Sequence, residues 1–246
     1  GPINHVLPAW DVSCGLYAAL AVVAAIHRRN QSGIGARVSI ALEDVALATA
    51  GNLGLLTEPQ VIGTQRERLG NSIYGQYGQD FAGRDGSRFM VVLLTRRHFR
   101  DLVHVTGTGP AMSALAEALK ADFGSEGDRY RYRDVLSGLF ATWFTDHTGD
   151  EITAALSGTS VLWERYRTFA EVAEGPKVTA NPLFSRLQQP GVGEYLAPAM
   201  PAAFDGVHPA SAAAPALGAD TADVLTECLG CTAADIARLT SANTIA

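Results

Sequence analysis

The chain has 246 residues, with 19 basic and 25 acidic side chains and a net charge of −6 at pH 7. A mildly acidic chain without a basic cluster does not suit a nucleic acid or an anionic membrane as its main partner. Three cysteines in a chain of this length indicate reduced thiols, so we expect a cytoplasmic protein of one large or two smaller domains.

The first element that the sequence predicts is an apolar helix after Asp11. Pro8 cannot lie inside a helix and favours an extended residue before it. The stretch from Val12 to Ile26 is rich in Ala and Leu and long enough for about four turns. Asp11 therefore falls at the expected N-cap, and capping alone would account for it. The run from Leu16 to Ile26 is too short to span a bilayer, and a buried helix is expected.

The next elements alternate between helix and strand. The helix is expected to end near Gly33, a residue that suits a left-handed C-cap. Val38–Leu42 is predicted to be a short strand, and Glu43 and Asp44 are predicted to begin a second helix that continues to about Leu56. Helices on both sides of a strand are typical of α/β proteins.

The middle of the chain is predicted to contain a hairpin followed by helices. Residues Glu58–Gly70 read as a linker because they are polar and carry Gly and Pro. Asp85-Gly86 between two β-prone runs indicates a hairpin, with Phe89–Leu94 as its second strand. Thr95 is expected to cap a helix, and 110–158 is expected to be mostly helical.

The last third is predicted to be less regular. A strand at Ser160–Trp163 and a short helix at Thr168–Ala173 precede an extended stretch, Asn181–Phe204, broken by Pro and Gly. An Ala/Pro-rich linker follows. Two short helices, Asp220–Cys228 and Thr232–Leu239, are expected at the end.

Several motifs together resemble the family III CoA-transferases, which include formyl-CoA transferase, carnitine CoA-transferase and alpha-methylacyl-CoA racemase. In that family an Asp at the head of an apolar helix is followed by an Arg, a Gly-x-Gly turn and a short strand. This chain has, in that order, Asp11, Arg28-Arg29, Gly33-Ile34-Gly35 and Arg37–Leu42. Further stretches resemble one branch, in which CoA moves within a single C5 dicarboxylate: Asn4–Asp11, Asn52-Leu53-Gly54 and Tyr74–Phe81.

The resemblance implies an α/β fold: a doubly wound, Rossmann-like large domain, a smaller inserted α/β domain, and two interlocked chains. By this comparison, 1–57 is the end of the N-terminal part of the large domain, 58–175 the small domain with its linker, and 176–246 the return segment and closing helices. Family members carry a further CoA-binding segment ahead of the Asp. We therefore expect an interlocked homodimer, or a complex with a chain that supplies this segment.

The resemblance also implies the chemistry. Asp11 would act as a nucleophile on an acyl-CoA, with His5, Asn71, Tyr74 and Gly75 near the substrate. CoA would be part of the substrate, and no separate cofactor is expected. A carboxylate nucleophile forms a covalent intermediate that divides one difficult step into easier ones.

The same sequence features are compatible with two other functions. In alpha-methylacyl-CoA racemase the Asp is a proton-transfer base, and its His partner lies in the preceding segment of the family. A non-catalytic subunit or remnant is the other alternative. No metal is expected, because Cys228 and Cys231 have metal-like spacing but no further ligands accompany them.

Overall fold

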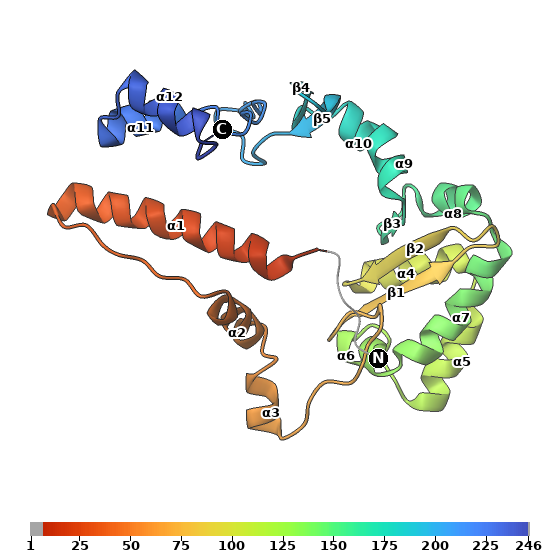
Figure 1. Cartoon of the computed structure of the whole chain (residues 1–246). Helices are drawn as coiled ribbons and strands as arrows, with labels where there is room; N and C mark the ends of the chain where they lie inside the picture. The colour runs from red at the N-terminus through yellow and green to blue at the C-terminus, as the bar shows by residue number, and fades with distance from the viewer. Residues whose placement is uncertain (1–6, 246) are drawn as a thin grey trace. The chain divides into compact units, whose positions relative to one another are not determined.

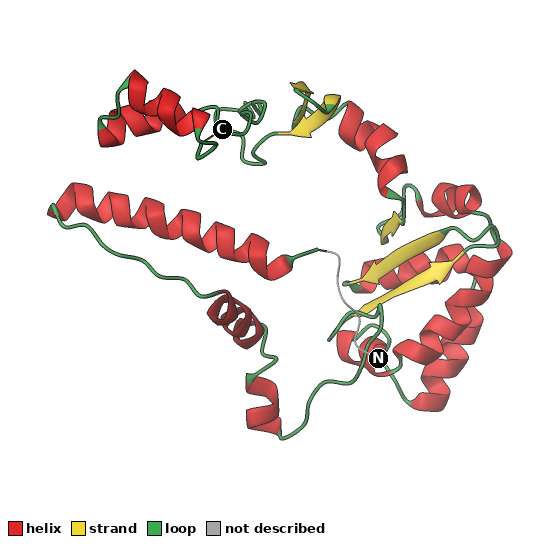
Figure 2. Ribbon diagram, viewed as in Figure 1, coloured by secondary structure: helices red, strands yellow, loops and turns green. Residues whose placement is uncertain are grey.

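The structure, a computed structural model, describes residues 7–245 of the chain. The chain forms two compact units, one that ends at Tyr74 and one that begins at Gly75. Figures 1 and 2 show their helices and strands, and each unit is described by itself.

The first unit contains three helices: α1 (Ala9–Ser32), α2 (Leu42–Asn52) and α3 (Thr57–Ile62). The expected C-cap of α1 is confirmed, because Gly33 has φ 72° and its N–H donates to the Arg29 carbonyl. Only glycine adopts this left-handed conformation readily. The acidic start of α2 is also confirmed, with Glu43 and Asp44 in its first turn.

Two expectations for this unit are wrong. Val38–Leu42 does not form a strand, and α2 begins at Leu42. A strand needs a paired neighbour for its backbone groups, and the described residues of this unit contain no other strand. The second difference is that α2 stops at Asn52 and α3 occupies the start of the expected linker.

The first unit exposes most of its apolar side chains. Val45 is its one buried hydrophobic residue among those described, and α1 has none. The expectation of a buried helix is therefore wrong for the described residues, since no neighbouring element covers the apolar side chains of α1. With 24 residues, α1 is also longer than the apolar run from Leu16 to Ile26. By length and composition it is able to cross a membrane, and a core helix or a signal sequence passes the same test. The exposed large residues of α1 are Trp10, Val12, Leu16, Tyr17, Leu20, Val22, Val23 and Ile26.

The second unit is organised around a three-stranded antiparallel sheet in the order β1-β2-β3. The strands are β1 (Tyr77–Ala82), β2 (Arg88–Leu93) and β3 (Leu162–Arg165). The predicted hairpin is confirmed: Gly78 pairs with Val92, Phe81 pairs with Phe89, and Gly86 in the turn has φ 81°. Asp85 braces this turn by accepting hydrogen bonds from Ser87 and from the Gly149 N–H.

Five helices lie between β2 and β3 in the chain and confirm the helical prediction for its middle part. Figure 2 shows helices beside the sheet. The predicted cap is confirmed, since Thr95 accepts a hydrogen bond from the His98 N–H. Phe81 and Phe144 stack with their rings 4.4 Å apart, and both belong to one hydrophobic core. The helices are α4 (Arg96–Thr106), α5 (Gly109–Leu119), α6 (Glu126–Arg131), α7 (Arg133–Asp146) and α8 (Gly149–Leu156).

The rest of the second unit differs from the predicted elements at three places. The strand expected at Ser160–Trp163 lies at Leu162–Arg165, and residues 176–179 form a helix that was not predicted. The stretch expected to be merely extended forms an antiparallel hairpin, β4 (Phe184–Gln189) and β5 (Gly193–Pro198). Thr168 forms the capping box that begins the predicted short helix. The remaining helices are α9 (Phe169–Glu174), α10 (Pro176–Thr179), α11 (Thr221–Leu229) and α12 (Ala233–Ser241).

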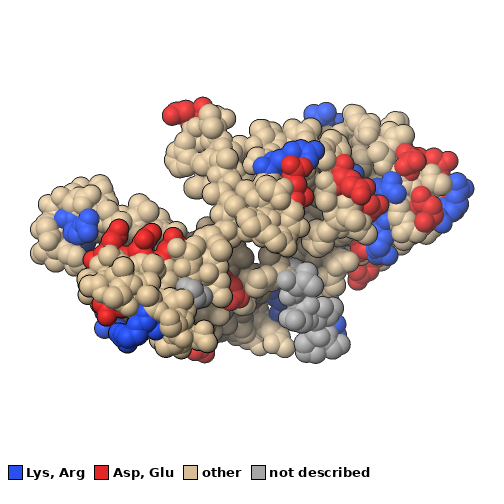
Figure 3. Space-filling view, turned by 45° about the horizontal axis from the view of Figure 1, so that its top comes forward, with Lys and Arg blue, Asp and Glu red and all other residues tan. Residues whose placement is uncertain are grey.

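The α/β class is thus confirmed, with both sheets of the described residues antiparallel. In the space-filling view, side chains of both charge signs are scattered over the surface shown (Figure 3). Neither the basic nor the acidic side chains form an extended patch on that surface, as expected from the composition.

Arg129 is a charged side chain inside the second unit. It is 0% exposed, and its guanidinium donates to the carbonyls of Phe123, Gly124 and Leu94 at 3.0, 3.0 and 3.3 Å. Burial lowers its pKa. The three bonds join the end of β2 to the loop before α6.

Replacing Arg129 by Lys is expected to lower the free energy of unfolding by about 3 kcal/mol, because an ammonium cannot reproduce the planar fork and leaves carbonyls unpaired. Urea titration of both proteins measures the difference. Arg131→Lys, on the same helix, is the control and is expected to change the stability little. Equal urea midpoints for all three proteins would show that the hydrogen bonds of the Arg129 guanidinium do not stabilise the second unit.

Candidate active site

Asp11 lies in the first turn of α1, two residues inside the helix rather than at the expected N-cap. Pro8 occupies the N-cap, and its carbonyl accepts the Val12 N–H at 3.0 Å. Ala9 begins the helix because Ala has the highest helix propensity and needs no side-chain cap. The N-cap prediction is therefore wrong by three positions, but Asp11 still lies at the positive end of the helix dipole.

The carboxylate of Asp11 is open to an incoming molecule. Asp11 is exposed, and no hydrogen bond or ion pair joins it to another residue that the structure describes. Gly15 lies on the same side of α1, one turn further along, and the position of its missing Cβ has no atom within 4 Å. The surface of α1 beside Asp11 is therefore unobstructed at Gly15.

Hollows occur along α1, but Asp11 lines none of those described here. One of about 340 Å³ lies against α2 and is mostly apolar, and another of about 280 Å³ lies within two turns of Asp11. Both are open to the surface. The first is lined by Tyr17, Ala21, Ser39, Ile40, Ala41, Asp44, Val45 and Ala48, and the second by Ser13, Leu16, Tyr17 and Leu20.

The other expected site residues fall in different places. His5 lies outside the described residues. Asn71 is exposed in the turn that leads to Tyr74, and Tyr74 is the last residue of the first unit. Gly75 is the first residue of the second unit and has φ 75°. Their relation to Asp11 remains a prediction.

Tyr74 belongs to a cluster that the sequence did not suggest. Its hydroxyl donates to Glu58 Oε1 at 2.8 Å, and the Arg66 guanidinium lies 3.8 Å from the centre of its ring. Arg66 Nε donates to the other oxygen of Glu58. The Tyr74 hydroxyl and then Arg66 hold the pKa of Glu58 below its usual range, and Glu58 raises the pKa of Tyr74.

The stretch Tyr74–Phe81, which carries part of the family resemblance, begins with a short loop that leads into β1. Tyr77 and Gly78 already belong to β1, and the Tyr77 hydroxyl lies 2.9 Å from Ser137 Oγ. Burial raises the pKa of Tyr77. Only Gly75 and Gln76 connect Tyr74 to the sheet, and Gln76 Nε2 donates to Glu126 at 2.8 Å.

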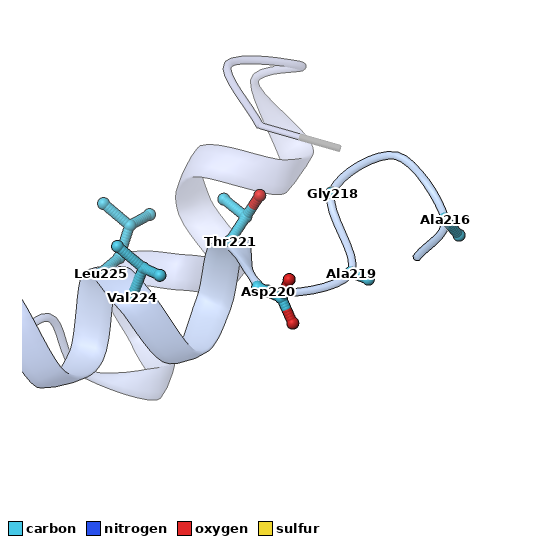
Figure 4. A pocket seen from close by; sticks show the side chains of 7 residues that line it. All are labelled: Ala216, Gly218, Ala219, Asp220, Thr221, Val224 and Leu225. Atoms are coloured by element: carbon cyan, nitrogen blue, oxygen red, sulfur yellow. The ribbon is translucent and has the colours of Figure 1, made fainter. Parts of the chain in front are cut away.

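A third hollow lies at the start of α11 in the second unit (Figure 4). It has a volume of about 370 Å³, and Asp220 is its one ionisable lining residue. A single carboxylate beside small apolar side chains does not define a catalytic site. Among the described residues, no group of three His, Cys, Asp or Glu side chains is arranged to hold a metal ion.

Comparison with protein families gives the affiliation of the chain. The family model for CoA-transferase family III matches residues 1–221. The chain belongs to CoA-transferase family III. The matched residues include both the exposed Asp11 and the Tyr74–Gly75 junction.

Two relatives within the family come from Chloroflexus aurantiacus. The 2-methylfumaryl-CoA isomerase of that organism is 41% identical over 240 residues, which cover 96% of this chain and 59% of the relative. Its succinyl-CoA–D-citramalate CoA-transferase is 27% identical, over 93% of this chain and 56% of the relative. The chain therefore spans between half and three-fifths of the length of these relatives.

Solved structures show the same fold. The orthorhombic crystal form of Rv3272 from Mycobacterium tuberculosis has a TM-score of 0.69 at 18% identity, and covers 90% of this chain and 57% of that chain. A mutant of the same protein has a TM-score of 0.71 at 18% identity, with coverage of 92% and 57%. At this identity the likeness concerns the fold alone.

Substitution of Gly75 tests whether the short loop after Tyr74 positions the substrate. Gly75→Val is expected to lower kcat by about 10²-fold, because a misplaced positioning segment loses orientation of the substrate. Its effect on the melting temperature is expected to be that of the backbone strain alone, since no atom lies within 4 Å of the Cβ position and the positive φ is the source of the strain.

Gly63→Val is the matched control for this substitution. Gly63 has φ 78°, and its Cβ position also has no atom within 4 Å. The control should therefore carry the same strain without the loss of turnover. Unchanged steady-state kinetics in Gly75→Val would show that the loop has no part in positioning the substrate.

Proposed function

We propose that this protein transfers CoA between carboxylates through a covalent intermediate on Asp11, within one C5 dicarboxyl-CoA of the 2-methylfumaryl (mesaconyl) type. The observation that carries the proposal is the open carboxylate of Asp11 at the positive end of α1. The 41% identity to 2-methylfumaryl-CoA isomerase over 96% of the chain supports the intramolecular form.

The proposed reaction conserves the thioester energy through four transfers. The Asp11 carboxylate attacks the thioester carbonyl, which forms a mixed anhydride and releases the CoA thiolate. The thiolate then attacks the Asp11 carbonyl, which gives an aspartyl thioester and frees the C1 carboxylate of the substrate. The C4 carboxylate of the retained acid attacks this thioester, which breaks the C–S bond, forms a second anhydride with Asp11 and releases the CoA thiolate again. The thiolate finally attacks the C4 carbonyl and regenerates Asp11.

Two features of the chain support this sequence of steps. The helix dipole favours a carboxylate in the first turn of α1, where an attacking group must be anionic. Backbone N–H groups at a helix start or in a glycine-containing loop suit the developing oxyanion, and Gly75 is available for close approach. Water must be excluded while the anhydride exists, which requires cover over α1.

We propose that protein supplies this cover. The first unit leaves α1 exposed, and an apolar helix of this kind is stable in water only when it is packed. The cover is an interlocked second copy or a chain that carries the CoA-binding segment, and the acyl-CoA is the small-molecule partner. The assembled protein is then cytoplasmic, without nucleic acid, membrane or separate cofactor.

Trapping of Asp11 tests the proposal against racemisation. Incubation with 2-methylfumaryl-CoA and hydroxylamine or borohydride should add mass to the peptide that contains Asp11. In a parallel incubation with a saturated 2-methylacyl-CoA, whose α-carbon carries a hydrogen that 2-methylfumaryl-CoA lacks, no deuterium from the solvent should enter that carbon. A racemase base only moves a proton, so deuterium incorporation without an adduct would reject the transferase and favour alpha-methylacyl-CoA racemase chemistry.

A further inference from the structure

The Glu58–Arg66–Tyr74 cluster stands out because the unit around it is so sparsely packed. The side chains of Glu58 and Arg66 are 17% and 24% exposed, whereas nearly every other polar residue of the first unit is open to solvent. Each residue of the cluster interacts with the other two. Glu58 accepts from Tyr74 and Arg66, and Arg66 both stacks on Tyr74 and donates to Glu58.

The cluster joins four separate parts of the first unit. Glu58 lies in the first turn of α3, and Arg66 lies in the linker that follows α3. Arg66 also donates to the Leu53 carbonyl at 3.1 Å, just after α2. The guanidinium packs beside Gly54, where a Cβ would lie 3.4 Å from it, at van der Waals distance. The chain before Tyr74 is therefore held to the end of α2.

The residues after Gly75 belong to the second unit and are held within it. Gln76 donates to Glu126 at the start of α6, and Tyr77 enters β1. Gly75 alone separates the two attachments, with φ 75° and open space at its Cβ position. A glycine between two fixed ends concentrates rotation at one residue.

We propose that Glu58 and Arg66 are positioning residues that act through Tyr74. They anchor the chain to the Asp11-bearing unit up to Tyr74, so that Gly75 becomes the pivot from which the loop leaves. The cluster thus fixes the point within the first unit from which the chain continues into Gly75. The inference rests on the proposed function only in giving this loop a role toward the substrate, and the anchor itself is measurable without turnover.

Hydrogen exchange of the full chain tests the anchor. Tyr74→Phe keeps the ring over Arg66 but removes the hydrogen bond to Glu58, and Arg66→Lys removes the planar group that stacks and donates. Both should accelerate exchange in the peptide covering 71–78 by about tenfold, the lower limit expected for loss of a bond to a charged group. Peptides from β2 and α7 should be unchanged.

Arg68→Lys is the matched control. Arg68 is exposed two residues further along the same linker and makes no hydrogen bond or ion pair with the described residues. Its exchange should equal that of the wild type. Unchanged exchange in both cluster variants would show that the cluster does not hold the backbone at Tyr74. An equal rise throughout α2 and α3 would show that it stabilises the first unit in general and has no positioning role.

The pH dependence gives a second readout. The stabilisation from Glu58, whose pKa is lowered, is present above the usual carboxyl range and is lost as pH falls through the lowered value. The stabilisation from Tyr74, whose pKa is raised, is present below the usual phenol range and is lost as pH rises through the raised value. Protection of 71–78, corrected for intrinsic exchange, should therefore fall at both extremes, and the alkaline fall should vanish in Tyr74→Phe.

A kinetic arm separates this inference from the proposed function. In an active assembly, Tyr74→Phe should lower kcat more than it changes KM, and Arg68→Lys should change neither. If the wild type shows no CoA transfer, the proposed function fails while the exchange result still decides the anchor. If CoA transfer proceeds and exchange is unaffected by the cluster variants, the anchor fails alone.

Discussion

Asp11→Asn is expected to abolish CoA transfer, lowering kcat by about three orders of magnitude or more, as for other enzymes that lose their nucleophile. The amide preserves the shape of the side chain but cannot form the anhydride. Asp11→Glu keeps the charge and displaces it by one methylene, which is expected to cost about 10²-fold through misplacement. Steady-state assays and the trapping reaction measure both variants in the assembled protein.

Asp44→Asn is the control for the helix itself. Asp44 is exposed in the first turn of α2, at the same position within its helix as Asp11 in α1. Both substitutions remove a favourable charge–dipole interaction, so they should lower the melting temperature similarly. Only Asp11→Asn should eliminate the adduct. Full turnover of Asp11→Asn would remove Asp11 from the mechanism.

The sequence predicted those elements whose signals are local. The C-cap at Gly33, the cap at Thr95 and the Asp85-Gly86 turn were all predicted correctly, because each depends on residues within one turn. The strand expected at Val38–Leu42 failed for the opposite reason. Strand formation depends on a partner that the local pattern does not specify.

The candidate site also contains residues with a local sequence signal and residues that only the fold brings together. Asp11 was recognised from its position before an apolar helix and from family resemblance, although the helix begins earlier than Pro8 and Asp11 suggested. Glu58 and Arg66 were missed because they lie 16 and 8 positions from Tyr74 in a stretch that reads as a polar linker. No periodicity brings residues at such spacings together. Only the fold of the linker shows that they meet.

The isolated 246-residue chain is expected to aggregate or to melt without cooperativity. Leu16 and Leu20 of α1 are 68% and 67% exposed, and α1 contributes no residue to a core. Such a surface binds apolar dyes and other exposed helices. Co-expression with a CoA-binding segment of the family should produce a soluble, interlocked dimer. Size-exclusion chromatography with light scattering, together with a thermal melt, measures both states.

Substitution within α1 identifies what covers it. Leu16→Asp with Leu20→Asp should weaken association with the covering protein by about 10³-fold, because each buried leucine contributes about 2 kcal/mol. Val61→Asp is the control, since Val61 in α3 is 77% exposed but lies outside α1. A cooperatively melting monomer of the unmodified chain would contradict a protein cover. Flotation of the chain with neutral lipid vesicles, lost in the double variant, would instead assign α1 to a membrane.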